Sequence, residues 1–201
     1  MLKFASIQYH VFILMAILGF LLLPDACQLA WHHNDEIKEK VLSLHSGQTH
    51  AGILLSQIKE FLPMSPEIIV TTTGPGSFTS IRVQLAAAIG LKIGYRAKLF
   101  CPNTLDLLEW ASNGSIPVLD SFRGDYFTKL DGVVRCITTK EIDTLKREHK
   151  SFCGDLGWTP ENLAIYLLKY YLSYKDPDIL NKPEPYYVRT PEYKTRTYNR
   201  K

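Results

Sequence analysis

The sequence is poor in cysteine and has no large surplus of either charge. Its four cysteines, Cys27, Cys101, Cys136 and Cys153, lie far apart among 201 residues and include no Cys-x-x-Cys pair. A small secreted disulfide scaffold is denser in cysteine, and a zinc site needs ligands at short spacing, so both are disfavoured. We expect free thiols in a reducing cytoplasm. The net charge of +3 does not by itself indicate nucleic acid binding, because phosphate binding needs clustered cations.

Long hydrophobic runs are also missing. The longest uncharged apolar run, 11–23, has 13 residues, whereas a membrane-spanning helix takes about 20. This length fits the core of a signal peptide as well as a buried strand, and a strand is favoured because no small-x-small cleavage site follows. We interpret residues 1–14 as an extension before the domain, with Met15 as an alternative start. A membrane-tethered form is the less favoured alternative to a cytoplasmic protein without membrane association.

Common catalytic motifs are absent as well. The glycine turn at 74–76 lacks the lysine of a P-loop and the third glycine of a dinucleotide fingerprint. No Gly-x-Ser-x-Gly elbow surrounds Ser77, which disfavours protease activity. His45 and His50 are five residues apart and have no third ligand nearby, so we expect no metal site. The remaining composition, 46% apolar and 21% charged, is that of an ordinary globular protein.

The sequence does contain an alternation of short β-like runs and longer helical patterns. Strands are predicted at 16–20, 26–31, 36–44, 68–72, 98–101, 116–122, 126–131 and 133–137. Helices are predicted at 50–62, 79–94, 104–111, 140–149 and 160–174. The turns between the first three strands are too short for parallel crossovers, so the pattern predicts an α/β fold with a mixed sheet.

Polar residues mark the connections. Asn34-Asp35 predicts a hairpin tip. Thr49, Asn103 or Thr104, and Thr159 before Pro160 are candidate helix caps.

The polar stretch 112–115 is the best boundary between two lobes. We predict an N-terminal lobe over 15–112, a smaller C-terminal lobe over 113–190 and a basic tail over 191–201. The tail could touch RNA phosphates, although a solvated end is the favoured interpretation.

Residues 68–82 predict a strand, a tight turn and a helix. Gly74 and Gly76 permit positive φ on either side of Pro75. The N–H groups at the start of the following helix could hold an anion, but a turn that only lets strand and helix pack closely is favoured. Ser77 fits a helix cap better than a nucleophile.

This region resembles the signature of the TsaB (YeaZ-like) family. The matching run is Gly74-Pro75-Gly76-Ser77-Phe78-Thr79-Ser80-Ile81-Arg82, followed by an alanine-rich helix. Three further segments, one before this run and two after it, occur in the family's order: Thr49-His50-Ala51, Asp120-Ser121-Phe122-Arg123-Gly124-Asp125-Tyr126 and Pro185-Tyr186-Tyr187-Val188-Arg189. The resemblance covers 16–189 and is weakest after 136. It implies an actin-like (ASKHA, ribonuclease-H-like) fold of two lobes, with mixed sheets flanked by helices.

The resemblance also implies a role in tRNA threonylcarbamoyladenosine modification. Members of the family pair with the catalytic subunit TsaD and, together with the ATPase TsaE, support transfer of the threonylcarbamoyl group. The ATP and metal chemistry lies on those two partners. The chain would then be a non-catalytic heterodimerisation subunit without a cofactor, in contact with tRNA only indirectly through the complex, and able to form a homodimer in isolation.

One departure from the family pattern bears on activity. The family's first strand continues into Asp-Thr-Ser, where this chain has Leu21-Leu22-Leu23, with Asp25 shortly after. Leucine offers neither a carboxylate for magnesium nor a hydroxyl donor, so phosphoryl chemistry is disfavoured. The alternative function is an actin-like-fold phosphotransferase or hydrolase with its own nucleotide site.

The predicted partner surface lies on the first two long helices. Ala86 and Gly90 begin a stripe of small residues on which another backbone can approach, while Ile81, Leu85 and Ile89 on the opposite side suit the chain's own sheet. Without the resemblance, both helices would be interpreted as core. The predicted interface residues are His50, Ile53, Leu54, Gln57, Ile58, Val83, Ala86, Ala87 and Gly90.

Two residues outside these helices are candidates for the cleft between the lobes. Asp120 and Arg123 could orient a bound group there, although a local salt link is the simpler interpretation.

Overall fold

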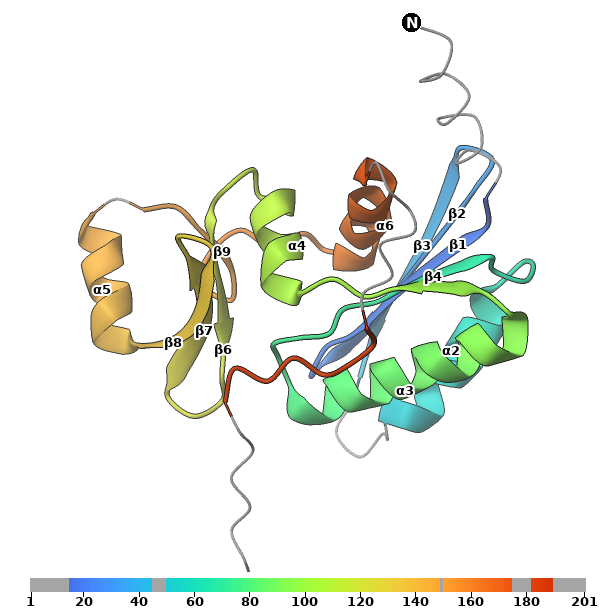
Figure 1. Cartoon of the computed structure of the whole chain (residues 1–201), viewed down its shortest axis with the longest axis horizontal. Helices are drawn as coiled ribbons and strands as arrows, with labels where there is room; N and C mark the ends of the chain where they lie inside the picture. The colour runs from blue at the N-terminus through green and yellow to red at the C-terminus, as the bar shows by residue number, and fades with distance from the viewer. Residues whose placement is uncertain (1–14, 45–49, 149, 175–181, 190–201) are drawn as a thin grey trace, which may run out of the picture.

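A computed structural model describes residues 15–44, 50–148, 150–174 and 182–189 of the chain. Two β-sheets lie side by side, with helices packed against them (Figure 1). The predicted extension 1–14, the helix cap at Thr49 and the basic tail 191–201 fall outside the described residues.

The first sheet is mixed, as predicted. Its strand order is β3-β2-β1-β4-β5. The strands are β1 (Ile17–Leu22), β2 (Ala26–His33), β3 (Glu36–Ser43), β4 (Ile68–Val70) and β5 (Lys98–Phe100). The first three are antiparallel neighbours, and β4 and β5 continue the sheet parallel to β1. Asn34 and Asp35 take φ of 53° and 62° at the predicted hairpin tip, as a tight two-residue turn requires.

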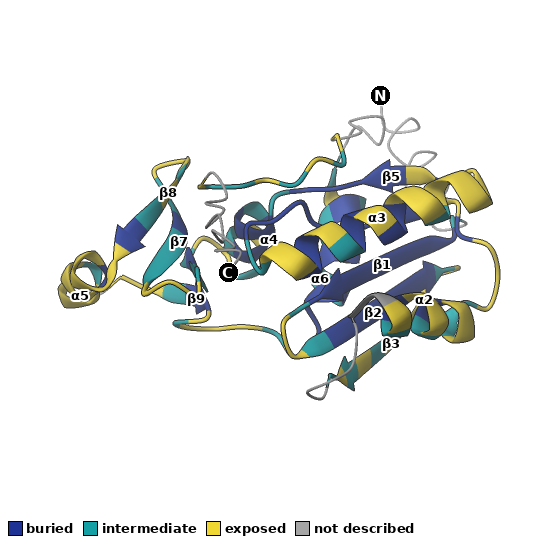
Figure 2. Cartoon of the chain, turned by 90° about the horizontal axis from the view of Figure 1, so that it is seen from below, coloured by how far each residue is buried: buried dark blue, intermediate teal, exposed yellow. Residues whose placement is uncertain are grey.

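Helices cover both faces of this sheet. The helices α2 (His50–Phe61) and α3 (Phe78–Tyr95) lie on one face, and α4 (Thr104–Ala111) and α6 (Leu163–Ser173) on the other (Figure 1). Because successive side chains of a strand alternate, Leu18 and Phe20 join the core under α2 and α3, while Ile17 and Leu21 join the core under α6. All six residues of β1 are therefore buried (Figure 2). Burial on both faces explains the continuous apolar run and confirms the strand interpretation for 17–22.

The second sheet has the order β8-β7-β6-β9. It consists of β6 (Ile116–Asp120), β7 (Asp125–Leu130), β8 (Val133–Thr138) and β9 (Phe152–Gly154), with α5 (Thr139–Arg147) at its far side. Strand β9 was not predicted. Helix α5 begins at a capping box, in which Thr138 and Glu141 satisfy each other's backbone N–H groups.

Helix α6 packs on the first sheet, although the predicted boundary placed its residues in the smaller lobe. Leu163, Leu167 and Leu168 share a core with Ile17 and Leu21 of β1. The division at 112 therefore separates the two sheets, but the helix α6 that follows the second sheet belongs to the core of the first. The chain returns to the first sheet after completing the second.

The predicted start of this helix at Thr159-Pro160 is wrong. The Thr159 hydroxyl donates to the Gly154 carbonyl, 2.8 Å away, and is used in the turn after β9. Asn162 is the N-cap, since its side-chain oxygen accepts from Ala164 N at 3.0 Å. The Asn162 amide also donates to the Leu29 carbonyl at 3.1 Å. One side chain thus begins the helix and ties it to β2.

The cysteines are free, as expected. Cys27, Cys101 and Cys153 are buried, and Cys136 is half-buried. Burial raises the pKa of Cys27 to about 11 and that of Cys101 to about 12. At neutral pH both groups remain thiols, which makes them poor nucleophiles.

His32 in β2 gives the fold a pH dependence. Its side chain is buried, and its Nδ1 atom has no hydrogen-bond partner among the described residues. Burial lowers the pKa of His32, so the folded state favours the neutral ring. Below the ordinary histidine value of about 6.5 the unfolded chain takes up the proton more readily, and stability is lost.

We expect the free energy of unfolding to fall between pH 7 and pH 5, and to fall less steeply in His32→Leu. The slopes of the two proteins should differ by at most about 1.4 kcal/mol per pH unit, the contribution of one proton. Urea denaturation at several pH values measures both slopes. Equal slopes in the two proteins would contradict the assignment.

Candidate functional site

The glycine turn before α3 is held by backbone contacts on two sides. Thr104 N donates to the Gly74 carbonyl at 2.7 Å, and Tyr186 N donates to the Thr73 carbonyl at 2.8 Å. Gly74 has φ of 106° and is followed by a cis peptide bond to Pro75. A Cβ atom on Gly74 would lie 2.7 Å from Ile81 Cδ1. These contacts support the interpretation of the turn as a close-packing device.

Ser77 is the N-cap of α3, as predicted. Its hydroxyl accepts from Ser80 N at 3.5 Å. The next two residues of the family signature face outward, since Phe78 and Thr79 are exposed. The Arg82 guanidinium lies over the Phe78 ring, 3.7 Å from its centroid.

A second segment forms the hairpin tip between β6 and β7. Phe122 N donates to Asp120 Oδ1 at 2.6 Å, and Arg123 N donates to Ser121 Oγ at 3.2 Å. The Ser121 hydroxyl also bonds to the Asp125 carboxylate. The Asp120 carboxylate thus accepts a backbone N–H of the tip. Among the described residues it forms no ion pair with Arg123, so the predicted salt link between them is wrong.

Phe122 is strained at this tip. It has φ of 59°, in the left-handed region that side chains other than glycine occupy at a cost of about 1–2 kcal/mol. Its ring is 64% exposed, so burial does little to offset that cost. The hydrogen bonds of the tip hold it in place.

We predict that Phe122→Gly leaves the free energy of unfolding unchanged or raises it by up to about 1 kcal/mol, because glycine takes this φ without strain. Phe127→Ala, at a half-buried position of β7 without positive φ, is the control and should lower stability. Thermal unfolding of both variants tests the strain. A loss in Phe122→Gly as large as that in the control would contradict it.

A third segment, 182–189, connects the two lobes (Figure 1). The Tyr187 ring stacks on Phe78 with centroids 5.3 Å apart, and its hydroxyl accepts from Arg82 Nε at 2.8 Å. Two residues later, Arg189 forms an ion pair with Asp125 of β7. The segment therefore binds the amino end of α3 to the second sheet.

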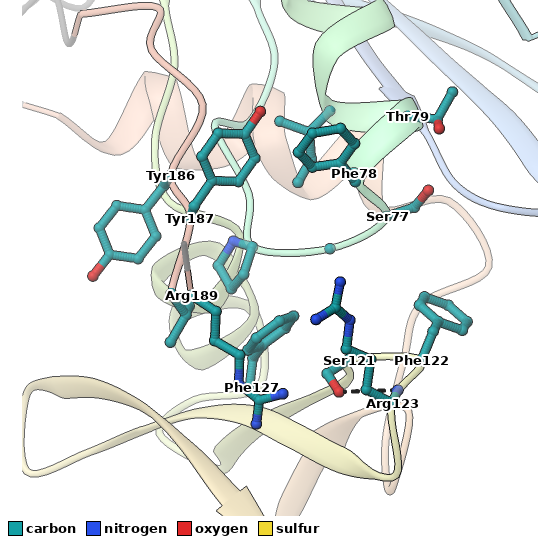
Figure 3. Close-up of a pocket in the computed structure, with 14 residues that line it drawn as sticks. Ser77, Phe78, Thr79, Ser121, Phe122, Arg123, Phe127, Tyr186, Tyr187 and Arg189 are labelled. Atoms are coloured by element: carbon teal, nitrogen blue, oxygen red, sulfur yellow. Dashed lines mark hydrogen bonds between the residues drawn. The ribbon is translucent and has the colours of Figure 1, made fainter. Parts of the chain in front are cut away.

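These three segments surround one cavity of about 450 Å³. Its wall contains residues from 75–81, 121–127 and 186–189, which are also the segments that carry the family resemblance. Figure 3 shows the Arg123 side chain directed into the cavity, whereas Arg189 is directed away, towards β7. Nothing in the sequence other than their common resemblance indicated that these segments meet.

A second cavity of about 420 Å³ lies on the other side of Phe122, which lines both. Its wall contains Leu21, Leu22 and Leu23, the residues that the sequence resemblance aligns with the family's Asp-Thr-Ser. Three carboxylates, those of Asp25, Asp120 and Asp155, also line it, and no lysine or arginine among the described residues does. Within the described part of the chain, no three acidic, histidine or cysteine side chains are grouped closely enough to hold a metal ion.

The third cavity is a groove of about 370 Å³ between α2 and α3. It is lined by Leu55, Val83, Ala86, Ala87, Gly90 and Leu91. Four of the predicted interface residues (Val83, Ala86, Ala87 and Gly90) therefore meet here. A Cβ atom on Gly90 would have no neighbour within 4 Å, so the groove floor is open. Figure 2 shows exposed faces on both helices.

Part of the predicted interface on α2 needs correction. Leu54 and Ile58 are 0% and 1% exposed and fill the chain's own core, so neither is available to a partner. Leu55, which was not among the predicted interface residues, is 51% exposed and lines the groove. Ile53 is half-buried, and Gln57 accepts a hydrogen bond from Lys40 Nζ at 2.8 Å. The side chain of His50 falls outside what the structure describes.

On α3, Ile81 and Leu85 are buried as predicted, but Ile89 is 38% exposed. With 3.6 residues per turn, Ile89 points about 80° away from Ile81, which turns it from the sheet towards solvent. Ile93 is 72% exposed on the same helix and was not predicted as a surface residue. Across the described residues, no helix has an apolar stretch sufficient to cross a membrane.

Two mixed sheets with helices packed against them define an α/β protein of the actin-like, ribonuclease-H-like fold. The structure is similar to the crystal structure of an uncharacterized protein with similarity to peptidase YeaZ from Pseudomonas aeruginosa. The TM-score is 0.66 at 14% sequence identity, over 88% of this chain and 100% of that chain. At this identity the likeness establishes the fold.

Two further solved structures match with lower TM-scores. YeaZ from Pseudomonas aeruginosa is 18% identical, with a TM-score of 0.49 over 63% of this chain and 66% of that one. RuvC from Thermus thermophilus is 11% identical, with a TM-score of 0.43 over 79% of this chain and 95% of that one. No protein-family model matches the sequence. No curated protein matches it either.

Proposed function

We propose that this chain is a TsaB-like, non-catalytic subunit that binds a TsaD-like catalytic subunit through the groove between α2 and α3. In that role it supports tRNA threonylcarbamoyladenosine modification together with a TsaE-like ATPase. The observation that carries the proposal is the open apolar groove lined by Leu55, Ala86 and Gly90, at the helices where the family resemblance places the partner.

The groove has the chemistry of a docking surface. Leu55 in the groove is 51% exposed, and Ile93, further along α3, is 72% exposed; covering such side chains is favourable by on the order of 1–2 kcal/mol each. Gly90 has no side chain, and Ala86 has only a methyl group. A partner backbone can therefore come close between them, and close approach increases the area of contact. Large side chains beside small ones allow the two surfaces to interlock.

The lining of the second cavity, beyond Phe122, supports a role without catalytic turnover. Leucines occupy the place of Asp-Thr-Ser, and the nearby carboxylates of Asp25, Asp120 and Asp155 would repel a nucleotide's phosphates. Among the described residues that line this cavity there is no lysine or arginine to neutralise a transferring phosphoryl group, and phosphoryl transfer depends on such cations.

The test is gel filtration of the purified chain alone, the TsaD-like protein of the same organism alone, and the two mixed. We expect a heterodimer peak in the mixture and no ATP hydrolysis by the chain alone. A chain that remains separate from the TsaD-like protein, whether as monomer or as homodimer, would contradict the docking role. ATP hydrolysis by the isolated chain would instead establish the alternative, an enzyme with its own nucleotide site.

A further inference from the structure

We propose that the cavity between the α3 turn, the β6–β7 tip and segment 182–189 binds a single nucleotide. The base would lie against Phe122, and the phosphate would bind Arg123. The ligand is either a free nucleoside monophosphate or one nucleotide of a single-stranded RNA, which share this chemistry. This site is independent of the docking groove, with which it has no residue in common.

The size and walls of the cavity fit a nucleotide. Its volume of about 450 Å³ lies within the range of small-molecule sites, which is roughly 300–1,000 Å³. The aromatic lining includes Phe78, Phe122, Phe127, Tyr186 and Tyr187. The ring of Phe78 already stacks on Tyr187 and lies under the Arg82 guanidinium. Phe122 is 64% exposed and stacks on no other ring among the described residues, so its face can accept a base.

The charged side chains around the two neighbouring cavities favour an anion in the cavity that Arg123 lines. Arg123 is directed into the cavity and forms no ion pair among the described residues, whereas Arg189 is paired with Asp125 (Figure 3). Of the residues that the structure describes, no acidic one lines this cavity, but three line the neighbouring one beyond Phe122. A guanidinium binds a phosphate through two parallel hydrogen bonds. The first N–H groups of α3, on the opposite wall, add partial positive charge.

The hairpin tip holds the two binding groups in neighbouring positions. Phe122 stays exposed in the left-handed region, where glycine is the ordinary residue, because Asp120 and Ser121 accept the N–H groups of the tip. Strain of this kind is retained where the position of the side chain is used. One hydrogen-bonded turn thus presents a flat ring and a cation to the same cavity.

Isothermal titration of the full chain tests the site with AMP, adenosine, ribose 5-phosphate and a single-stranded RNA tetranucleotide. Arg123→Gln should weaken AMP binding by about tenfold and leave adenosine binding unchanged, since only AMP carries a phosphate. Phe122→Ala should weaken AMP and adenosine by about tenfold and leave ribose 5-phosphate unchanged. Arg135→Gln, at an exposed arginine of β8 outside the cavity, removes the same charge and should change nothing.

Every outcome decides the question. Binding of AMP but not of the tetranucleotide assigns the site to free nucleotides, and tighter binding of the tetranucleotide assigns it to RNA. The absence of binding of both ligands at about 5 mM overturns the proposal, because a built site binds at least this well. Equal losses in Arg123→Gln and Arg135→Gln also overturn it, since they would reveal non-specific attraction. The circular dichroism spectrum of each variant confirms folding. None of these results depends on the TsaD-like partner.

Discussion

Ala86→Trp should abolish the complex with the TsaD-like subunit and leave the chain folded. Ala86 is exposed in the wall of the α2–α3 groove, where an indole would fill the space that a partner backbone needs. Steric exclusion at the centre of an interface typically costs at least 2–3 kcal/mol, so we expect affinity to fall by about 100-fold or more. Gel filtration of the mixed subunits and a binding titration measure the loss.

The matched control is Thr144→Trp, which adds the same indole to the exposed face of α5, beside the second sheet. It should form the complex as the unmodified chain does. Thermal unfolding of both variants shows whether the fold is intact. If Ala86→Trp binds normally, the docking face lies elsewhere on the molecule.

The neighbouring residues Leu54 and Leu55 should respond to alanine in opposite ways. Leu54 is fully buried under the first sheet, so Leu54→Ala removes core contacts and leaves a cavity, at a cost of about 2–5 kcal/mol. For a chain of this size the midpoint of thermal unfolding should fall by roughly 10 °C. Leu55→Ala removes a side chain that is 51% exposed and should cost less than about 1 kcal/mol.

Binding reverses the order of the two variants. Leu55 lines the groove, so Leu55→Ala should weaken the complex by about tenfold, while Leu54→Ala, measured well below its unfolding temperature, should bind normally. Scanning calorimetry and titration of the two proteins give both quantities. If Leu55→Ala lost as much stability as Leu54→Ala, the orientation of α2 described here would be wrong.

Much of the fold could be predicted because local chemistry agrees with the tertiary structure. The Asn34-Asp35 tip and the Ser77 and Asn103 caps each use a side chain or a φ value that acts within three residues. Sequence alone is sufficient for such features, since they depend on no distant partner.

The errors arose where distant contacts decide. Strand β9 has three residues, too few for alternation to be seen, and it forms because β6 provides a parallel partner. The start of α6 depends on Asn162, whose amide reaches β2 far back along the chain. Thr159-Pro160 has the local pattern of a helix start, but the threonine hydroxyl is used by the preceding turn.

The candidate surfaces show the same limit. The small residues of α3 could be recognised from their spacing, but the choice between Leu54 and Leu55 depends on how α2 is rotated against the sheet. The cavity at Phe122 and Arg123 was not predictable from periodicity, because its walls come from three segments that are far apart in sequence.

The return of α6 to the first sheet has a consequence for how the polypeptide is made. During synthesis, β1 to β5 leave the ribosome with part of one face uncovered, since the leucines of α6 that pack on Ile17 and Leu21 are translated only at 163–168. The residues between α4 and α6, which form the second sheet, are translated before α6 can pack on those strands. A truncated product that stops after α4 would expose to water the part of that face that α6 covers, and it would tend to aggregate.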